Sequence, residues 1–195
     1  MIHILTNTYQ LIDPWFGRSS TLPIELDLGC GKGRFALALA KRYPERLILA
    51  GDVMLGRLRK VARKAEQQQL ENIELMRASN IDLAAFQLPD SCIRRAHFLC
   101  PDPWPKEKHR NKRLFTTDFL TRLTRILEPG GILHVATDHE PYLQEIQGIV
   151  ATLNLLKPAP AALEDIQDLK TDFELIWENK GKTVPHLAYI CKKRL

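Results

Sequence analysis

The stretch Leu26-Asp27-Leu28-Gly29-Cys30-Gly31-Lys32-Gly33 decides the fold class of this chain. It begins in an apolar run that is typical of a buried strand, and it ends where a helical pattern opens. Its three glycines, Gly29, Gly31 and Gly33, permit a tight turn and let a ligand approach the main chain closely. A glycine turn between a strand and a helix indicates an α/β fold with a site for a nucleotide-like ligand.

The rest of the chain alternates short apolar runs with helical patterns, as βα units around a parallel sheet do. The expected strands span residues 23–28, 47–53, 73–77, 96–100 and 132–137. The expected helices span residues 35–42, 55–69, 81–86, 117–127 and 140–153. We expect a turn at 129–131, an irregular connector at 157–162 and a late edge strand at 187–191. This order predicts a mostly parallel twisted sheet with helices on both faces and ligands beyond the carboxyl ends of its strands.

Length and composition favour one domain, because 195 residues suffice for one buried core and are short for two. Residues 1–22 are expected to be an N-terminal arm that either folds over the site or stays mobile. The four cysteines show no metal-ligand spacing and no C-x-x-C pair, so neither a metal site nor disulfides are expected. No apolar run approaches the ~18 residues of a membrane span, and a cytoplasmic protein without membrane contact is expected.

The residues around the glycine turn favour one cofactor. Arg34 stands where a dinucleotide fingerprint has a third small residue, which favours an adenosyl ligand without phosphates. S-adenosylmethionine fits, because its ammonium and sulfonium are cationic and Asp27 precedes the turn. Asp52, at the end of the second strand, could accept both ribose hydroxyls, and Ser79 or Asn80 could contact the adenine edge. The alternative is an ordinary tight turn, with Asp52 a solvated acid.

A second unusual stretch, Pro101-Asp102-Pro103-Trp104-Pro105, follows the fourth expected strand. Its prolines restrict the loop to extended conformations and lower the entropy cost of holding its side chains in place. Trp104 could stack on a nucleobase while Asp102 accepts hydrogen bonds from the donor edge of that base. The alternative makes Trp104 a plug in the core and the prolines a rigid turn.

The residues after Trp104 are strongly basic. Residues 106–113 hold five lysines and arginines against Glu107, which accounts for most of the formal net charge of +5. Cations directly after a base-sized site predict sequence-independent phosphate contacts. The cations on the helix at 55–69 are expected to form only a solvated face.

Two later segments are further candidates. Asp138 closes the fifth expected strand, where it either contacts the target base or its ribose, or caps the helix that begins near Pro141. Thr171-Asp172-Phe173-Glu174 matches a capping box, in which the threonine hydroxyl and the glutamate three residues later satisfy amides at a helix start. The pattern alone favours that structural role.

These motifs together resemble the bacterial tRNA (guanine-N7-)-methyltransferase family. The resemblance rests on the glycine turn, the Pro-Asp-Pro-Trp loop with its basic run, Ala136-Thr137-Asp138-His139-Glu140-Pro141-Tyr142 and Thr171-Asp172-Phe173-Glu174. It implies a Rossmann-like class I methyltransferase fold over residues 1–195, with a C-terminal segment at 157–195 that contacts substrate. It also implies methyl transfer from S-adenosylmethionine to N7 of guanine 46 in the variable loop of tRNA, by a monomer or a homodimer.

The resemblance also implies roles for individual residues. Asp102 would be the catalytic carboxylate. The cofactor would be held by Asp27, Gly29, Gly31, Gly33, Asp52, Ser79, Asn80 and Asp102. The substrate would contact Lys106, Asp138, Thr171, Asp172, Phe173 and Glu174. RNA would contact Lys108, His109, Arg110, Asn111, Lys112 and Arg113. Asp27 stands where the family more usually has glutamate, and Ser79 where many members have Asp or Asn.

The chemistry expected of Asp102 follows from guanine N7, which carries an exposed lone pair and no proton. Asp102 is therefore expected to orient the base and to stabilise the positive charge that develops on it. One alternative is an exocyclic-amine nucleobase methyltransferase, whose Asp-Pro-Pro-aromatic loop is similar, although Trp104 occupies the place of the second proline. Another is a non-catalytic RNA-binding module, which the intact glycines and Asp52 oppose.

Overall fold

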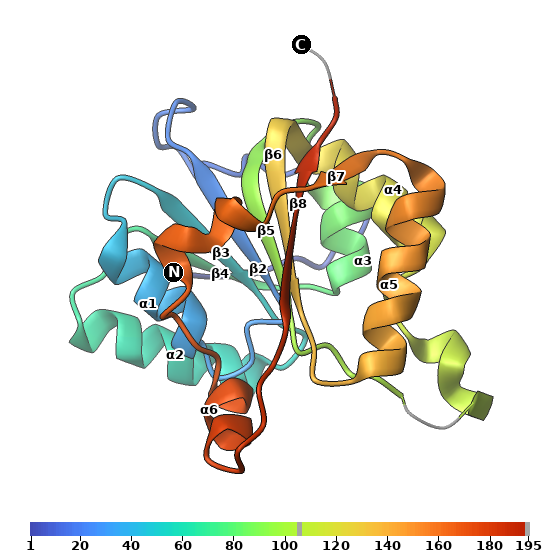
Figure 1. Ribbon diagram of the computed structural model, residues 1–195. Coiled ribbons are helices and arrows are strands. Elements are labelled where there is room, and N and C mark those ends of the chain that lie inside the picture. Colours follow the sequence, from blue (N-terminus) through green and yellow to red (C-terminus); the bar gives the residue numbers. More distant parts are fainter. Residues whose placement is uncertain (105–106, 194–195) are drawn as a thin grey trace.

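The computed structural model describes residues 1–104 and 107–193, with the side chains of residues 107, 110 and 111 outside the description. Its sheet has eight strands in the order β1-β4-β3-β2-β5-β6-β8-β7 (Figure 1). The strands are β1 (Ile2–Ile4), β2 (Ile24–Leu28), β3 (Leu47–Gly51), β4 (Ile73–Arg77), β5 (Ile93–Leu99), β6 (Leu127–Ala136), β7 (Leu156–Pro158) and β8 (His186–Cys191). The first six are paired in parallel, and β8 pairs antiparallel with both β6 and β7. The expectation of a mostly parallel sheet is confirmed.

Helices cover both faces of the sheet (Figure 1). On one face lie α1 (Arg34–Arg42) and α2 (Leu55–Gln67), and on the other lie α3 (Asn80–Asp82), α4 (Thr117–Ile126) and α5 (Glu140–Leu153). Shorter elements are the π-helix η1 (Leu83–Gln87), the 3-10 helices η2 (Glu107–Lys112) and η3 (Pro160–Ile166), and α6 (Asp172–Glu178). In the part of the chain described, no helix has the length and apolarity to cross a bilayer.

Two apolar cores hold these layers together. Phe35 of α1 and Val61 of α2 pack on one face, and Phe98, Phe119 and Tyr142 pack on the other. Every residue of β2 and β3 is buried, as expected of central parallel strands that are covered on both sides. The carboxyl ends of these strands therefore keep fixed positions, and the loops that follow them are carried by a rigid sheet.

Three predicted details differ in the structure. Residues 129–131 form no separate turn, because β6 starts at Leu127 and continues through them. The pairing with β5 shifts between Ile93 and Arg95, and Gly130 takes a φ of +74°, so the extra residues form an irregularity within the strand. The helix expected at 81–86 is instead α3 followed by η1.

The C-terminal strands also differ from the prediction. The strand expected at 187–191 forms as β8, but it lies between β6 and β7 and is not an edge. The edge is β7, which includes part of the expected connector at 157–162. Pro158 lies at the end of this strand, a position that its missing N–H allows on a sheet edge.

The N-terminal arm joins the sheet instead of folding over the site. Ile2–Ile4 pairs in parallel with β4, so the arm adds a strand to that edge. Glu74 of β4 binds Arg18 at 2.6 Å and His3 at 2.8 Å. Trp15 donates through its indole N–H to the carbonyl of Leu22 at 3.1 Å. These contacts anchor the arm at the sheet edge.

Candidate active site

A cavity of about 520 Å³ opens at the carboxyl ends of β2, β3, β4 and β5. Its lining includes many of the residues singled out in the sequence: Asp27, Gly29, Gly31, Asp52, Ser79, Asn80, Asp102, Trp104, Lys112, Thr171, Asp172 and Phe173. Sequence reasoning missed other lining residues, among them Arg57, Cys100, Leu114 and Ile176. Residues far apart in the chain thus meet at one end of the sheet, which is where ligands bind in open α/β folds.

The glycine turn after β2 has the left-handed backbone that its composition predicts. Gly29, Gly31 and Gly33 have φ values of +82°, +56° and +75°. The amides of Gly29 and Cys30 both donate to the carbonyl of Gly51, at 3.0 and 2.9 Å. A Cβ at position 33 would lie 2.6 Å from two methyl groups of Val61. Gly33 is therefore required for the approach of α1 to α2, whereas Gly29 and Gly31 line the cavity.

Asp27 is a buried carboxyl at the floor of the cavity. Burial, together with the negative charge of Asp52, raises its pKa to about 7. Among the described residues no hydrogen-bond donor reaches its oxygens. A bound cation would remove the penalty on ionisation, so Asp27 is suited to a positively charged ligand group.

Asp52 links the second strand to the glycine turn. One of its oxygens accepts from the amide of Gly31 at 3.1 Å, and the other accepts from the amide of Met54 at 2.7 Å. Arg57 lies 3.5 Å away as an ion-pair partner. This carboxylate therefore fixes the glycine turn and the start of α2 while it lines the cavity.

The two candidates after β4 have different surroundings. The hydroxyl of Ser79 accepts from the amide of Asp82 at 3.0 Å, so Ser79 caps α3. The side-chain nitrogen of Asn80 lies beside Gly29, 3.6 Å from where a Cβ of that residue would stand. Asn80 thus faces the glycine turn, and its amide has both a donor and an acceptor for a heterocycle edge.

The loop after β5 carries Asp102 between two residues of unusual backbone. Cys100 and Trp104 have φ values of +48° and +41°, a region that side chains rarely adopt. The amide of Cys100 donates to the carbonyl of Ala136 at 2.7 Å, and Arg113 donates to the carbonyl of Pro103 at 2.8 Å. These bonds fix both ends of the segment that presents the exposed Asp102 carboxylate to the cavity.

Trp104 is half-buried and lines the cavity, so it is not a plug in the core. The ammonium of Lys112 lies 4.8 Å from its ring centroid, within the range of a cation–π contact. The ring of His109 meets it edge-on at 5.7 Å. The aromatic ring and the cations of the loop thus form one surface.

The residues of the loop that were predicted to contact RNA differ in their exposure to solvent. Lys108 and Lys112 are exposed on η2, and His109 is half-buried. Arg113 is buried and forms an ion pair with Glu145, so its guanidinium holds the loop against α5. This placement gives Arg113 a structural role, and its contact with RNA stays a prediction. Lys106 and the side chains of Arg110 and Asn111 lie outside the described residues.

Asp138 and the capping box lie around the same end of the sheet. His139 caps α5 by accepting from the amide of Tyr142, so the cap alternative for Asp138 is wrong. Asp138 is exposed and does not line the cavity, although its charge is among those that act on Cys100. Burial and the nearby Glu174 raise the pKa of that thiol to about 12.

The capping box at the start of α6 is confirmed. The amide of Thr171 donates to Glu174 at 2.7 Å, and the amide of Glu174 donates back to the Thr171 hydroxyl at 3.2 Å. Glu174 is buried beneath the helix, whereas Phe173 is exposed at the cavity. In residues 1–104 and 107–193, no cluster of three or more His, Cys, Asp or Glu side chains could hold a metal.

Comparisons with known proteins agree with this geometry. A family model described as putative methyltransferase matches residues 21–187. The tRNA (guanine-N(7)-)-methyltransferase of Neisseria meningitidis is 31% identical over 175 residues, which cover 90% of this chain and 72% of that protein. The one from Mycobacterium avium is 33% identical over 147 residues, or 75% of this chain. Among solved structures, the 16S rRNA methyltransferase KamB aligns with a TM-score of 0.69 and 20% identity, over 94% of this chain and 95% of that one.

The fold and the matched residues define a methyltransferase of the Rossmann-like class I type. The chain belongs to the tRNA (guanine-N7-)-methyltransferase family, as the sequence resemblance implied. It spans 56% of the length of the Mycobacterium avium relative and 62% of the Nitrosospira multiformis relative.

Proposed function

We propose that this chain transfers a methyl group from S-adenosylmethionine to N7 of guanine 46 in the variable loop of tRNA. One observation carries the proposal. A single cavity joins the glycine turn and its two acids to Asp102 and Trp104, with exposed lysines at its rim. Membership of the family supplies the substrate, since its curated relatives are named for that reaction.

The residues around the glycine turn suit S-adenosylmethionine, which supplies the electrophilic methyl group when bound. Asp27 would meet the cationic part of the cofactor, because its buried carboxyl has no donor among the described residues and its pKa is raised to about 7. Asp52 would accept hydrogen bonds from the ribose hydroxyls. Asn80 would contact the adenine edge, since the hydroxyl of Ser79 is already engaged as a cap. Gly29 and Gly31 would let the main chain approach the cofactor.

Asp102 and Trp104 would hold the target guanine opposite this cofactor. Trp104 would stack on the base, and Asp102 would accept from its N1 and N2 edge. Because N7 has no proton, Asp102 acts on charge and orientation rather than as a general base. A carboxylate fixed beside a purine that becomes positive stabilises the transition state. In-line positioning of N7 contributes further to the rate.

The remaining contacts would bind the rest of the nucleotide and the RNA strand. Lys108, Lys112 and the predicted Lys106 would contact phosphates, which gives binding a strong salt dependence. The α6 residues Asp172 and Phe173 would contact the substrate from the other side of the cavity, and Asp138 would contact a part of the substrate that lies outside it. Cytoplasmic location and a monomeric or homodimeric state stay predictions.

The test is direct. The protein is incubated with methyl-labelled S-adenosylmethionine and unmodified tRNA, and the digested nucleosides are separated. Label in N7-methylguanosine, lost when guanine 46 is replaced by adenine in the transcript, supports the proposal. Label on an exocyclic amine identifies the alternative enzyme. Failure to bind S-adenosylmethionine in calorimetry, with RNA binding retained, identifies a non-catalytic module.

A further inference from the structure

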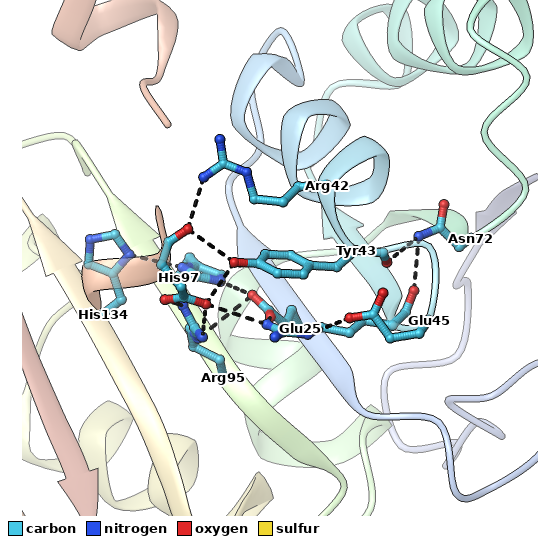
Figure 2. Close-up of polar contacts among 10 residues, drawn as sticks. Glu25, Arg42, Tyr43, Glu45, Asn72, Arg95, His97 and His134 are labelled. Atoms are coloured by element: carbon cyan, nitrogen blue, oxygen red, sulfur yellow. Dashed lines mark hydrogen bonds and ion pairs between the residues drawn. The ribbon is translucent and has the colours of Figure 1, made fainter. Parts of the chain in front are cut away.

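A line of hydrogen-bonded side chains crosses the sheet from β2 to α6. Nε2 of His97 lies 2.9 Å from Glu25, and its Nδ1 lies 2.9 Å from Nδ1 of His134. Nε2 of His134 lies 2.8 Å from Nδ1 of His186, and Nε2 of His186 lies 2.7 Å from Oε1 of Glu174. We call these five residues the histidine chain. Figure 2 shows its part from Glu25 through His97 to His134.

The histidine chain is almost entirely shielded from solvent. Glu25, His97, His134 and Glu174 are each at most 2% exposed, and the side chain of His186 is 24% exposed. His97 and His134 are paired across β5 and β6, and the ring of Phe35 packs edge-on against both. A buried polar group that lacks its partner costs stability, so each of these contacts needs a hydrogen.

The number of hydrogens can be counted. The chain has four contacts of 2.7–2.9 Å, and each requires one proton between its two atoms. Three neutral imidazoles carry one N–H each, and an ionised carboxylate carries none. Three hydrogens cannot fill four contacts. The histidine chain is complete only when it holds one proton more than three neutral rings provide.

The surroundings indicate where the extra proton lies. Burial lowers the pKa of His97 and of His134, which disfavours a second proton on either ring. Although burial acts in the opposite direction, hydrogen bonds from His97 and Arg46 and the charge of Arg95 lower the pKa of Glu25 to about 2. Hydrogen bonds from His186 and Thr171 likewise keep the pKa of Glu174 low against its burial. His186, the most exposed ring of the histidine chain, is therefore the ring best placed to hold the extra proton.

Further charged groups meet the histidine chain at its Glu25 end. Arg46 and Arg95 bind Glu25 on the β2 side, and Asp165 of η3 binds Arg95 through both oxygens, at 3.0 and 2.8 Å. Near Glu174 lies Cys100, whose thiol stays protonated because its pKa is raised to about 12. Among the described residues, Glu174 and His134 are the titratable groups in direct contact with His186.

We propose that His186, protonated on both ring nitrogens, is a positioning residue for the substrate side of the active site. It donates to His134 and to Glu174 at once, and Glu174 in turn holds the Thr171 cap of α6. That helix places Phe173 and Ile176 on the cavity wall. Without the extra proton, one contact between neighbouring rings of the histidine chain has two lone pairs facing each other, which weakens the link from His134 through His186 to α6. The inference rests on the proposed tRNA methyl transfer for its effect on activity.

A matched pair of variants separates the two hydrogen bonds of His186. In His186→Gln the amide reaches the Nε2 position and donates to Glu174, whereas in His186→Asn it reaches only the Nδ1 position and donates to His134. We expect His186→Asn to lower kcat/KM for tRNA about tenfold, mainly through KM, because Glu174 loses its charged donor. His186→Gln is expected to keep most of the activity.

Two readouts do not depend on methyl transfer. Long-range ¹H–¹⁵N spectra should show His186 protonated on both nitrogens, His134 on Nδ1 and His97 on Nε2. Hydrogen exchange at residues 171–178 should be faster in His186→Asn than in His186→Gln, while β3 stays protected in both as a control for folding. A neutral His186 ring, or equal exchange of α6 in both variants, would overturn the inference. Absence of tRNA methylation by the wild type would tell against the proposed function alone.

Discussion

Replacing Gly33 by alanine tests the steric account of the glycine turn. A side chain at φ +75° costs about 1–2 kcal/mol, because the left-handed backbone brings Cβ close to the next carbonyl. The new Cβ would also stand 2.6 Å from both γ-methyl groups of Val61, which is fully buried, and such overpacking costs about 1–3 kcal/mol. The lower entropy of the unfolded alanine variant offsets about 0.4–1 kcal/mol. We expect Gly33→Ala to lower the free energy of unfolding by about 2–4 kcal/mol.

Urea and thermal unfolding measure this loss, which corresponds to a fall in Tm of roughly 5–15 °C for a chain of this size. Gly29→Ala is the matched control, since its φ is +82° and its nearest neighbour would lie at 3.6 Å. It has the same backbone cost and the same offset from the unfolded state but no clash, so its net loss should be only about 0–1.5 kcal/mol.

Val61→Ala completes the test as a double-mutant cycle. Alone it should destabilise the protein by about 1–3 kcal/mol through lost burial and a cavity. Combined with Gly33→Ala it should relieve the clash, with a coupling of about 1–3 kcal/mol. Equal losses in Gly33→Ala and Gly29→Ala, without coupling to Val61, would refute the steric reasoning.

Three further predictions concern the cavity. Asp27→Asn should weaken S-adenosylmethionine binding in calorimetry, because the carboxylate that meets the cofactor's cation is lost. The same change should stabilise the ligand-free protein, because the pKa of Asp27 is about 7 in the folded protein against 3.8 for a free Asp, so ionisation of Asp27 destabilises the fold increasingly as the pH rises between these values. The gain should reach up to roughly 4 kcal/mol at pH 8 and be smaller at pH 5, and an equal gain at both pH values in urea unfolding would contradict it. Asp102→Asn should lower single-turnover methylation about 100-fold while tRNA binding stays intact; near-normal turnover would exclude the electrostatic role. Replacing Lys108 and Lys112 together by alanine should weaken binding of all tRNAs alike and reduce the salt slope of log K by about 1–2, whereas an unchanged slope would show that neither contacts phosphate.

The sequence was sufficient for features that local chemistry determines. The structure confirms three such features: the glycine turn around Cys30, the capping box at Thr171 and the alternation of strands with helices. Each depends on residues that are close together in the sequence. Because the carboxyl ends of parallel strands meet at one edge of the sheet, the predicted parallel sheet was enough to place Asp27, Asp52 and Asp102 at one cavity.

Features that depend on pairing between distant segments were not predictable. The order β6-β8-β7 and the irregularity at Gly130 follow from register, which apolar periodicity leaves open. The burial of Arg113 depends on Glu145, which stands 32 residues later. The histidine chain could be recognised only once strand order was known, because His97, His134 and His186 share a face only after β5, β6 and β8 are aligned.

The short strand β7 has a consequence for self-association. An exposed sheet edge can template pairing with a second chain, and natural proteins prevent this with brief strands, lysine and proline at the border. The β7 border has all three, since it comprises only Leu156, Lys157 and Pro158. Continuous β-pairing between two copies across this border is thereby disfavoured.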